Sequence, residues 1–302
     1  MKIAPHPHGP DRWPNLFIAG VPKSGTRSLT NALSAHTQVY VPVRHQPRFF
    51  ADLGLDRRWA GFFDVVQRED EYLALFRGRD EAQYRCDASP EYVFSAEAMR
   101  RIRAVEPAAK AIVVLRDPVE RAYSHYLNDV REGLEKRTFP QAIREQLSGV
   151  DSQRWPSHYV RYGHYGQALQ DASAIFKENL HVVFFEELTS DSDAVLRGVA
   201  DFLSLDFEGF GARGLGHLNE AALPRGEIAR HLLGSPFFRR LARALTPRRA
   251  RPSMRRLFVS RKSVPAIDPQ AHRLLVREYA GEANAVAAIL GRRPAWRNFA
   301  EA

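Results

Sequence analysis

Apolar runs and amphipathic stretches alternate along the chain in the manner of an α/β protein. Short continuous apolar runs predict buried strands, and apolar residues that recur every three or four positions predict helices. The predicted strands cover residues 16–19, 83–88, 111–115 and 181–185. The predicted helices cover residues 26–35, 95–105, 119–132, 165–176, 193–203 and a long final stretch, 268–290. Because the two kinds of element alternate, we expect a central parallel sheet flanked by helices.

The length and composition fit one large core. The chain has 302 residues, of which 44% are hydrophobic. We therefore predict a single domain over residues 14–302, preceded by a flexible tail at residues 1–13. Residues 49–79 are predicted to be helical or irregular, and residues 131–158 to form an excursion near the site. The one cysteine, Cys86, lies in a strand-like run, which predicts a buried structural thiol and excludes an internal disulfide.

The first predicted strand runs into a short loop and then a helix. Gly20 and Gly25 allow the backbone to turn tightly, and the first N–H groups of the helix are left unpaired and point at one spot. Lys23 adds a full positive charge at that spot. The hydroxyl side chains that add donors are Ser24, Thr26 and Ser28. This combination predicts a loop that binds an anionic group such as phosphate.

The loop differs from the P-loop of nucleoside-triphosphate enzymes, in which Lys and then Ser or Thr directly follow the second Gly. Here Thr26 and Arg27 follow Gly25, and the lysine lies inside the loop at Lys23. The usual Mg²⁺ ligand is therefore missing, so transfer from ATP is disfavoured and no metal is expected. On this loop alone, a plain strand-to-helix connection remains the alternative.

A second apolar strand, residues 111–115, runs directly into Arg116 and a helix that begins near Pro118. Ligands of open parallel sheets bind at the carboxyl ends of the strands, so Arg116 is expected at the same edge as the first loop. Its guanidinium can hold a phosphate through two parallel hydrogen bonds. Ser124, about two turns into the helix, can hold the same group. The pair predicts a second phosphate-binding point.

Together the two segments resemble the sulfotransferase family that uses 3'-phosphoadenosine 5'-phosphosulfate (PAPS). Residues 22–26, Pro-Lys-Ser-Gly-Thr, look like the family's 5'-phosphosulfate loop, and residues 116–124 look like its 3'-phosphate motif. Residues 20–27 are similar to the opening of the heparan-sulfate-type and related bacterial sulfotransferases, rather than to the small-phenol and steroid group. Further matches lie at residues 87–92, 162–165, 182–188, 202–203, 218–220, 224–225 and 290–296, so the likeness covers roughly residues 14–299.

The resemblance implies an α/β fold of the P-loop-containing nucleotide hydrolase-like sulfotransferase kind. It implies in-line transfer of a sulfuryl group from PAPS to an acceptor hydroxyl or amine, with 3',5'-ADP as the product. Lys23 would neutralise the departing bridging oxygen, while Arg116 and Ser124 would hold the 3'-phosphate. The residues implied around the 5'-phosphate and sulfuryl oxygens are Lys23, Ser24, Gly25, Thr26, Arg27 and Ser28. Arg261 and Lys262 occupy a place similar to the late basic loop that closes over the adenosine.

One position departs from the family pattern. Many glycan sulfotransferases carry Lys-Glu-Pro-x-Phe-Phe, with the Glu as general base, whereas residues 45–50 here read His-Gln-Pro-Arg-Phe-Phe. Gln46 therefore stands where the base is expected, and an amide cannot take up the hydroxyl proton. We favour His45 as the base, because imidazole titrates near neutral pH. Loss or alteration of activity is the alternative.

Several charged residues remain candidates on the acceptor side. The spare carboxylates that could serve as base are Asp52, Asp87 and Glu91. We predict that Asp87 and Glu91 contact the acceptor and that Arg48 steers an anionic acceptor. A sugar hydroxyl of a glycan or glycolipid is favoured by the resemblance, with peptide tyrosine and small metabolites left open.

The formal net charge of +9 suits an anionic cofactor and an acidic acceptor. Much of the excess lies in a basic segment, residues 237–262, where arginines interleave with apolar residues. A solvated basic helix is the plain interpretation. Contact with the acceptor or with an anionic membrane surface is the functional alternative, and nucleic-acid binding is less favoured.

The first 14 residues are rich in Pro and His and contain no apolar stretch, and no run approaches the roughly 20 apolar residues that span a bilayer. We therefore expect a cytoplasmic, bacterial enzyme, with membrane-surface association as a variant of that expectation. Two other function classes stay open at this point. One is a nucleotide-dependent kinase of similar fold, and the other is a non-catalytic protein that binds PAPS or glycans.

Overall fold

The computed structural model describes residues 12–44, 46–51, 65–78, 81–149, 158–210, 223–224, 259–260 and 265–300. The chain divides into two compact units. The first comprises Met1–Asp117, His164–Leu218 and Ala280–Ala302, and the second comprises Pro118–Gly163 and Asn219–Tyr279. Each unit is described by itself, and the single domain predicted over residues 14–302 stays a prediction.

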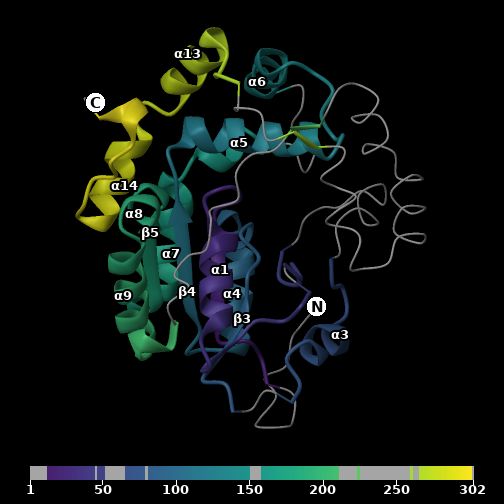
Figure 1. Ribbon diagram of the computed structural model, residues 1–302, viewed down its shortest axis with the longest axis vertical. Coiled ribbons are helices and arrows are strands. Elements are labelled where there is room, and N and C mark those ends of the chain that lie inside the picture. Colours follow the sequence, from purple (N-terminus) through teal and green to yellow (C-terminus); the bar gives the residue numbers. More distant parts are fainter. Residues whose placement is uncertain are drawn as a thin grey trace. The chain divides into compact units, whose positions relative to one another are not determined.

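A five-stranded parallel sheet forms the centre of the first unit (Figure 1). The strand order is β2-β3-β1-β4-β5, and every neighbouring pair is parallel. The strands are β1 (Leu16–Gly20), β2 (Val39–Tyr40), β3 (Tyr84–Asp87), β4 (Lys110–Leu115) and β5 (Leu180–Phe184). The predicted parallel sheet and its four predicted strands are confirmed. The two-residue β2 was missed, since so short a run carries no periodic signal.

The helices of the described chain follow the predicted alternation with strands. They are α1 (Thr26–Ala35), α3 (Glu69–Ala74), α4 (Ala96–Val105), α5 (Pro118–Arg131), α6 (Phe139–Leu147), α7 (Gly166–Phe176), α8 (Phe185–Ser190), α9 (Ser192–Leu203), α13 (Pro269–Glu278) and α14 (Glu282–Leu290). Short strands β6 (Leu223–Pro224) and β7 (Val259–Ser260) pair antiparallel in the second unit. Within the described residues, no helix is both long and apolar enough to cross a lipid bilayer.

The two faces of the sheet are buried in different ways. One face packs on α1 and α9, where Leu29 and Leu196 join Ile18 and Ile112 of the strands in a single apolar cluster. The other face carries aromatic rings, since Phe17 of β1 lies 6.0 Å from Phe50, centroid to centroid. Burial on both faces explains why the central strands read as continuous apolar runs.

Two boundaries differ from expectation. Trp13, placed at the end of the predicted tail, is buried, and its carbonyl accepts a hydrogen bond from Arg85 Nη2 at 3.1 Å; residues 1–11 lie outside the described residues. The single helix predicted over residues 268–290 is wrong, because the chain forms α13 and α14 with a break between them. Tyr279 ends α13 with its ring buried and its hydroxyl donating to Val160 O at 2.8 Å.

Cys86 is buried and has a free thiol, as predicted. Burial raises its pKa well above the ordinary thiol value, with the neighbouring Asp87 carboxylate adding to the effect. A thiol held protonated in this way is a poor nucleophile, so the structural role predicted for Cys86 is consistent with its surroundings.

We predict that Gly20→Ala destabilises the first unit. An added Cβ would lie 2.6 Å from Val93 Cγ1 and 3.2 Å from Val113 Cγ1, so it has packed side chains on two sides. Overpacking of this kind costs about 1–3 kcal/mol, which urea unfolding can measure. Gly198→Ala, inside α9 with nearest contact His181 Cε1 at 4.0 Å, is the matched control. It should leave stability unchanged or raise it by up to about 1 kcal/mol, and equal effects of the two changes would contradict the packing at Gly20.

Candidate functional site

The loop between β1 and α1 makes a tight turn at the carboxyl end of the sheet. Lys23 and Gly25 both adopt positive φ angles, 73° and 88°. The Ser24 N–H donates to Val21 O at 3.2 Å, and the Ser28 N–H donates to Gly25 O at 2.9 Å. A left-handed conformation at Lys23, a residue with a Cβ, is uncommon and is concentrated at functional sites. The turn brings the lysine to the beginning of α1.

The N-terminus of α1 is suited to an anion. Gly25 is the N-cap residue, no side chain of the described chain caps this end, and the first turn holds no acidic residue. The early N–H groups of the helix, including those of Thr26 and Arg27, have no intrahelical acceptor. The Ser24 side chain is fully buried, and its Oγ has no hydrogen-bond partner among the described residues. A ligand oxygen would satisfy these donors, so the loop fits a phosphate or sulfate group.

Arg116 brings the second predicted segment to the same place. It follows β4, which pairs directly with β1 in the sheet. Arg116 Nη1 donates to Lys23 O at 3.3 Å, and the guanidinium carbon lies 4.4 Å from the centroid of the Phe185 ring. The tips of two strands about ninety residues apart are thus in contact, as the sequence predicts for parallel neighbours.

The Phe185 ring packs close to Gly25 of the β1–α1 loop, a contact that the sequence did not predict. It is the first residue of α8, and an added Cβ on Gly25 would lie 2.8 Å from Phe185 Cδ2. Gly25 therefore serves two needs, because its positive φ and the approach of the ring both exclude a side chain. Only the three-dimensional structure identifies Phe185, since an aromatic residue after an apolar strand reads as ordinary core.

The half-buried carboxylate of Glu186 fixes the backbone directly after Arg116. Glu186 Oε1 accepts the Asp117 N–H at 3.0 Å, and burial raises the Glu186 pKa. Asp117 Oδ2 in turn accepts the Asn298 side-chain amide at 2.9 Å. These contacts order the segment that follows β4, and the sequence shows no sign of them because Asn298 lies far along the chain.

The remaining predicted nucleotide-binding residues differ in position. Thr26 and Ser28 are buried in α1, whereas Arg27 is exposed. Ser124 is half-buried on α5, in the second unit. Residues that lie outside the described chain are His45, Asp52, Arg261, Lys262 and the basic segment apart from β7.

Gln46, Arg48 and Glu91 form a cluster in the first unit. Arg48 Nη2 donates to Gln46 Oε1, and Arg48 Nε and Nη2 each donate to Glu91 Oε1 at 3.1 Å. The Arg48 and Glu91 side chains are about nine-tenths buried. Gln46 and Arg48 have positive φ angles, 63° and 55°, so the backbone of this segment bends where Arg48 contacts both Gln46 and Glu91. Arg48 therefore lies in a buried ion pair rather than on an open surface.

Asp87 lies beneath this cluster at the end of β3. Its side chain is fully buried and accepts hydrogen bonds from Tyr72 at 2.7 Å, Tyr92 at 2.8 Å and Ser89 at 2.6 Å. Burial raises the Asp87 pKa to about 6, although the three donors and Arg48 oppose the rise. The predicted contact between Asp87 and the acceptor stays a prediction, and the observed surroundings of Asp87 favour a supporting role. The carboxylate is occupied by protein donors and supports the site from below.

The sequence did not reveal which residues donate to Asp87, although Ser89 and Tyr92 lie in the matching stretch 87–92. Tyr72 belongs to α3, in the segment predicted only as helical or irregular, and its ring stacks on Phe49 with centroids 4.4 Å apart. Ser89 also accepts the Arg48 N–H at 3.0 Å. The spacing of these tyrosine and serine residues in the sequence does not predict that they meet. Only the fold shows that they surround Asp87 and that Ser89 binds the backbone of Arg48.

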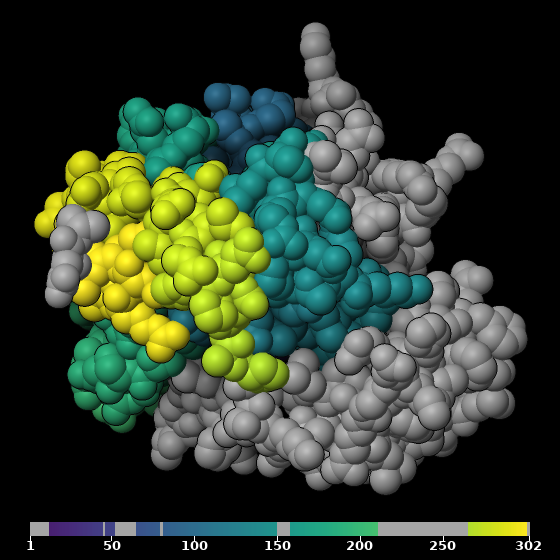
Figure 2. Space-filling view, turned by 90° about the horizontal axis from the view of Figure 1, so that it is seen from above, coloured from purple at the N-terminus to yellow at the C-terminus, as the bar shows by residue number. Residues whose placement is uncertain are grey.

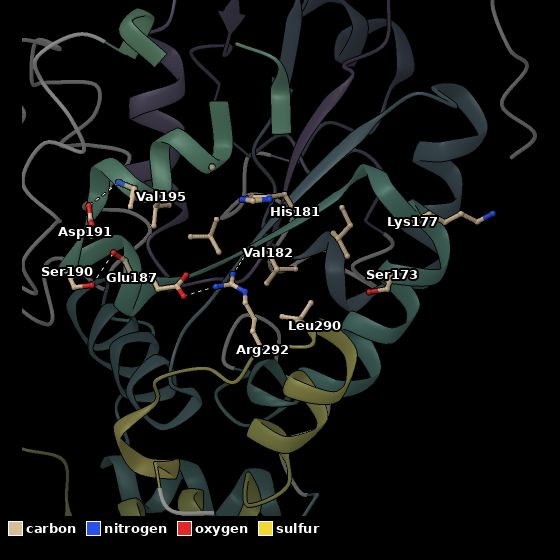
Figure 3. Close-up of a pocket in the computed structure, with 14 residues that line it drawn as sticks. Ser173, Lys177, His181, Val182, Glu187, Ser190, Asp191, Val195, Leu290 and Arg292 are labelled. Atoms are coloured by element: carbon tan, nitrogen blue, oxygen red, sulfur yellow. Dashed lines mark hydrogen bonds and ion pairs between the residues drawn. The ribbon is translucent and has the colours of Figure 1, made fainter. Parts of the chain in front are cut away.

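A separate cavity of about 670 Å³ lies along the outer edge of β5 (Figure 3). Arg292 crosses that edge, where it donates to Val182 O at 2.7 Å and to Glu187 Oε1 at 2.6 Å. Leu290 of α14 lines one side of the cavity, and α14 packs on α7. Figure 2 shows α14 in yellow. Neither the β1–α1 loop nor Arg116 lines this cavity, so it is a separate surface feature.

In the described part of the chain, no group of three or more His, Cys, Asp or Glu side chains is arranged so that it could hold a metal ion. The features found at the sheet edge are a helix N-terminus, a lysine and an arginine. They define an α/β protein whose sheet edge offers positive charge and N–H donors, a combination suited to an anionic group.

The family follows from comparison with known proteins. The model of the sulfotransferase family matches residues 14–209, which include the β1–α1 loop and Arg116. The chain belongs to the sulfotransferase family. The resemblance predicted from residues 22–26 and 116–124 is confirmed.

Relatives and a solved structure agree with this assignment. The chain is 34% identical to mouse heparan sulfate glucosamine 3-O-sulfotransferase 6 over 208 residues, 68% of this chain and 56% of that protein. It is 31% identical to human heparan sulfate glucosamine 3-O-sulfotransferase 3B1 over 199 residues, 65% of this chain and 47% of that protein. The chain spans about half the length of these curated relatives.

The predicted fold is confirmed by a solved structure. A sulfotransferase from Alicyclobacillus acidocaldarius superposes with a TM-score of 0.70 at 22% identity, over 93% of this chain and 97% of that chain.

We predict that Asp87→Asn changes how stability depends on pH. Because the folded-state pKa of Asp87 lies above its unfolded-state value of 3.8, its contribution to the free energy of unfolding is complete below about pH 4. That contribution is lost as the pH rises through about 6. The wild-type protein should therefore lose about 3 kcal/mol relative to the variant between these limits. Urea unfolding of both proteins from pH 4 to 7 measures the difference, and a constant difference would contradict the raised pKa.

Proposed function

We propose that this enzyme transfers a sulfuryl group from PAPS to a hydroxyl group of a carbohydrate, releasing 3',5'-ADP. The observation that carries the proposal is the contact between Arg116 and the Lys23 carbonyl, 3.3 Å long. It lets one adenosine nucleotide with phosphates at both ends reach the loop and the arginine together. Family membership and the heparan sulfate relatives named above support the reaction type and the acceptor class.

The loop residues have roles that follow from their positions. Lys23 would place its charge beside the bridging oxygen that departs with 3',5'-ADP. The N–H groups at the start of α1, with the hydroxyls of Ser24, Thr26 and Ser28, would hold the 5'-phosphate and sulfuryl oxygens. Ser24 supports this most directly, because its buried Oγ lacks a partner in the described chain. Fixed donors of this kind supply most of the rate when negative charge spreads in a transition state.

Arg116 would hold the 3'-phosphate. The roles predicted for Ser124, which lies in the second unit, and for Arg261 and Lys262, which lie outside the described residues, stay predictions. The Phe185 ring against the Arg116 guanidinium keeps the planar group oriented, which favours two parallel hydrogen bonds to a phosphate. No residue in this scheme binds a metal, and the Lys23 position inside the loop disfavours the kinase alternative.

The acceptor would lie on the side of Gln46, Arg48 and Glu91. Sulfated glycans are polyanions, and the net charge of +9 suits them. The predicted contact of the basic segment with glycan or with an anionic membrane surface stays a prediction, because most of that segment lies outside the described residues. The cytoplasmic location also stays a prediction.

The cofactor assignment predicts a ligand preference. Thermal unfolding should shift upward with 3',5'-ADP and much less with ADP plus Mg²⁺, because the site offers two phosphate-binding points and no Mg²⁺ ligand. Stabilisation follows the ratio of ligand concentration to dissociation constant, so about 100-fold excess should add about 3 kcal/mol. A stronger response to ADP plus Mg²⁺ would overturn the proposed function.

Lys23→Ala should lower kcat at least about a hundredfold while the fold is kept, because a charge contact of about 3 kcal/mol at the transition state is removed. The measurement is release of 3',5'-ADP from PAPS with N-sulfated heparosan as the acceptor. Arg100→Ala is the control, since Arg100 is exposed and its ion pair with Glu97 is 3.7 Å long. Wild-type rates in the Lys23 variant would refute its role.

Arg116→Ala should weaken binding of 3',5'-ADP by at least tenfold and binding of 5'-AMP much less, because 5'-AMP lacks the 3'-phosphate. Calorimetric titration of both nucleotides into wild-type and variant protein gives the two ratios. An equal loss for both nucleotides would show that Arg116 shapes the loop through Lys23 and does not read the 3'-phosphate.

A further inference from the structure

Arg48 joins an amide and a carboxylate at the acceptor side of the site. Its guanidinium donates to Gln46 Oε1 and, through two N–H groups, to Glu91 Oε1. The arginine thus places the Glu91 carboxylate beside the side chain that occupies the family's base position. Position 46 lacks the carboxylate that the family pattern places there, and Glu91 in the same cluster has one.

The sheet geometry brings the segment that contains Glu91 to the carboxyl end of β1, where the β1–α1 loop begins. Strands β1 and β3 are parallel neighbours, with Phe17 opposite Asp87. The residues after Asp87 therefore continue along β1 toward its carboxyl end, where the loop begins. Val93 reaches Gly20, since an added Cβ on Gly20 would lie 2.6 Å from Val93 Cγ1. Glu91 is two residues from that contact.

The two Glu91 oxygens have different surroundings. Oε1 accepts both Arg48 hydrogen bonds, whereas Oε2 is buried and accepts none from the residues that the structure describes. A buried carboxylate oxygen without a donor is costly, and natural sites keep such a group where a ligand completes it. An acceptor hydroxyl is a donor of the right kind. Asp87, in contrast, already has three protein donors.

We propose that Glu91 is the general base of this enzyme, in place of the glutamate that Gln46 has replaced. Glu91 Oε2 takes the proton of the acceptor hydroxyl as the hydroxyl oxygen forms its bond to sulfur. The bond from sulfur to the bridging oxygen of PAPS breaks, and 3',5'-ADP leaves with that electron pair. The Gln46 amide NH₂ group, with Oε1 held by Arg48, donates to the attacking oxygen and orients it. The protonated Glu91 then returns its proton to water. This inference rests on the proposed function.

The test compares five proteins: wild type, Glu91→Gln, Gln46→Glu, the double variant Gln46→Glu with Glu91→Gln, and Glu97→Gln. Glutamine at position 91 keeps the shape and an acceptor for Arg48 but removes the base. Glu97 is an exposed carboxylate of α4 and serves as the matched control. Turnover is measured with saturating PAPS and N-sulfated heparosan, and 3',5'-ADP binding is measured by calorimetry.

Glu91→Gln should lower kcat by at least about a hundredfold, with little change in 3',5'-ADP affinity, because general base catalysis contributes 10²- to 10⁴-fold. The double variant should recover at least tenfold, since it restores a carboxylate within the cluster. Glu97→Gln should match wild type. A Glu91→Gln protein that changes only KM, or one that Gln46→Glu fails to rescue, would show that Glu91 merely orders Arg48 and would overturn the inference.

Two further outcomes separate this inference from the proposed function. A wild-type protein that binds 3',5'-ADP and transfers nothing to the sugar, while Gln46→Glu transfers, shows that Glu91 does not act as base. A wild-type protein that does not bind 3',5'-ADP overturns the proposed function itself.

Discussion

The whole site depends on the parallel pairing of β1 with β4. In a parallel sheet the carboxyl ends of neighbouring strands emerge at one edge, so two loops far apart in sequence meet without any long-range steering. Here this edge brings the Lys23 carbonyl within 3.3 Å of Arg116. The strands are almost entirely buried on both faces, which fixes their register. Precise placement of the two positive groups is therefore a consequence of the hydrophobic core.

A second layer of support comes from the buried polar groups beneath the loop. Asp87 ties the hydroxyls of Tyr72 and Tyr92 together, and Glu186 holds the backbone after Arg116. Each such group is expensive to bury and is stabilised only when its partners are in place. Asp87 is held by three protein donors, whereas the buried Ser24 hydroxyl has no partner among the described residues. This combination of a fixed support and an open donor suits the proposed nucleotide, which must bind and then leave as 3',5'-ADP.

The sequence predicted individual helices and strands well, but it predicted few of the side-chain contacts between distant segments. Helix α1 was predicted with its observed limits because a glycine precedes it and an apolar periodicity runs through it. The final helix was predicted as one piece, since Gly281 alone is a weak break signal and the buried Tyr279 ring that ends α13 is a tertiary effect. In the site, Lys23 and Arg116 were found from their places after strands. The link from Gln46 through Arg48 to Glu91 was invisible, because it joins residues more than forty positions apart through side chains.

The Arg292 side chain has a consequence for how the molecule behaves in solution. β5 is an edge strand, and an exposed edge offers backbone groups to which another chain can add. Arg292 occupies the Val182 carbonyl on that edge, with its guanidinium carbon 4.4 Å from the centroid of the Phe184 ring. The ladder is thereby capped by a charged group from the C-terminal part of the same chain. Addition of a strand from another copy is therefore discouraged at the β5 edge of the sheet.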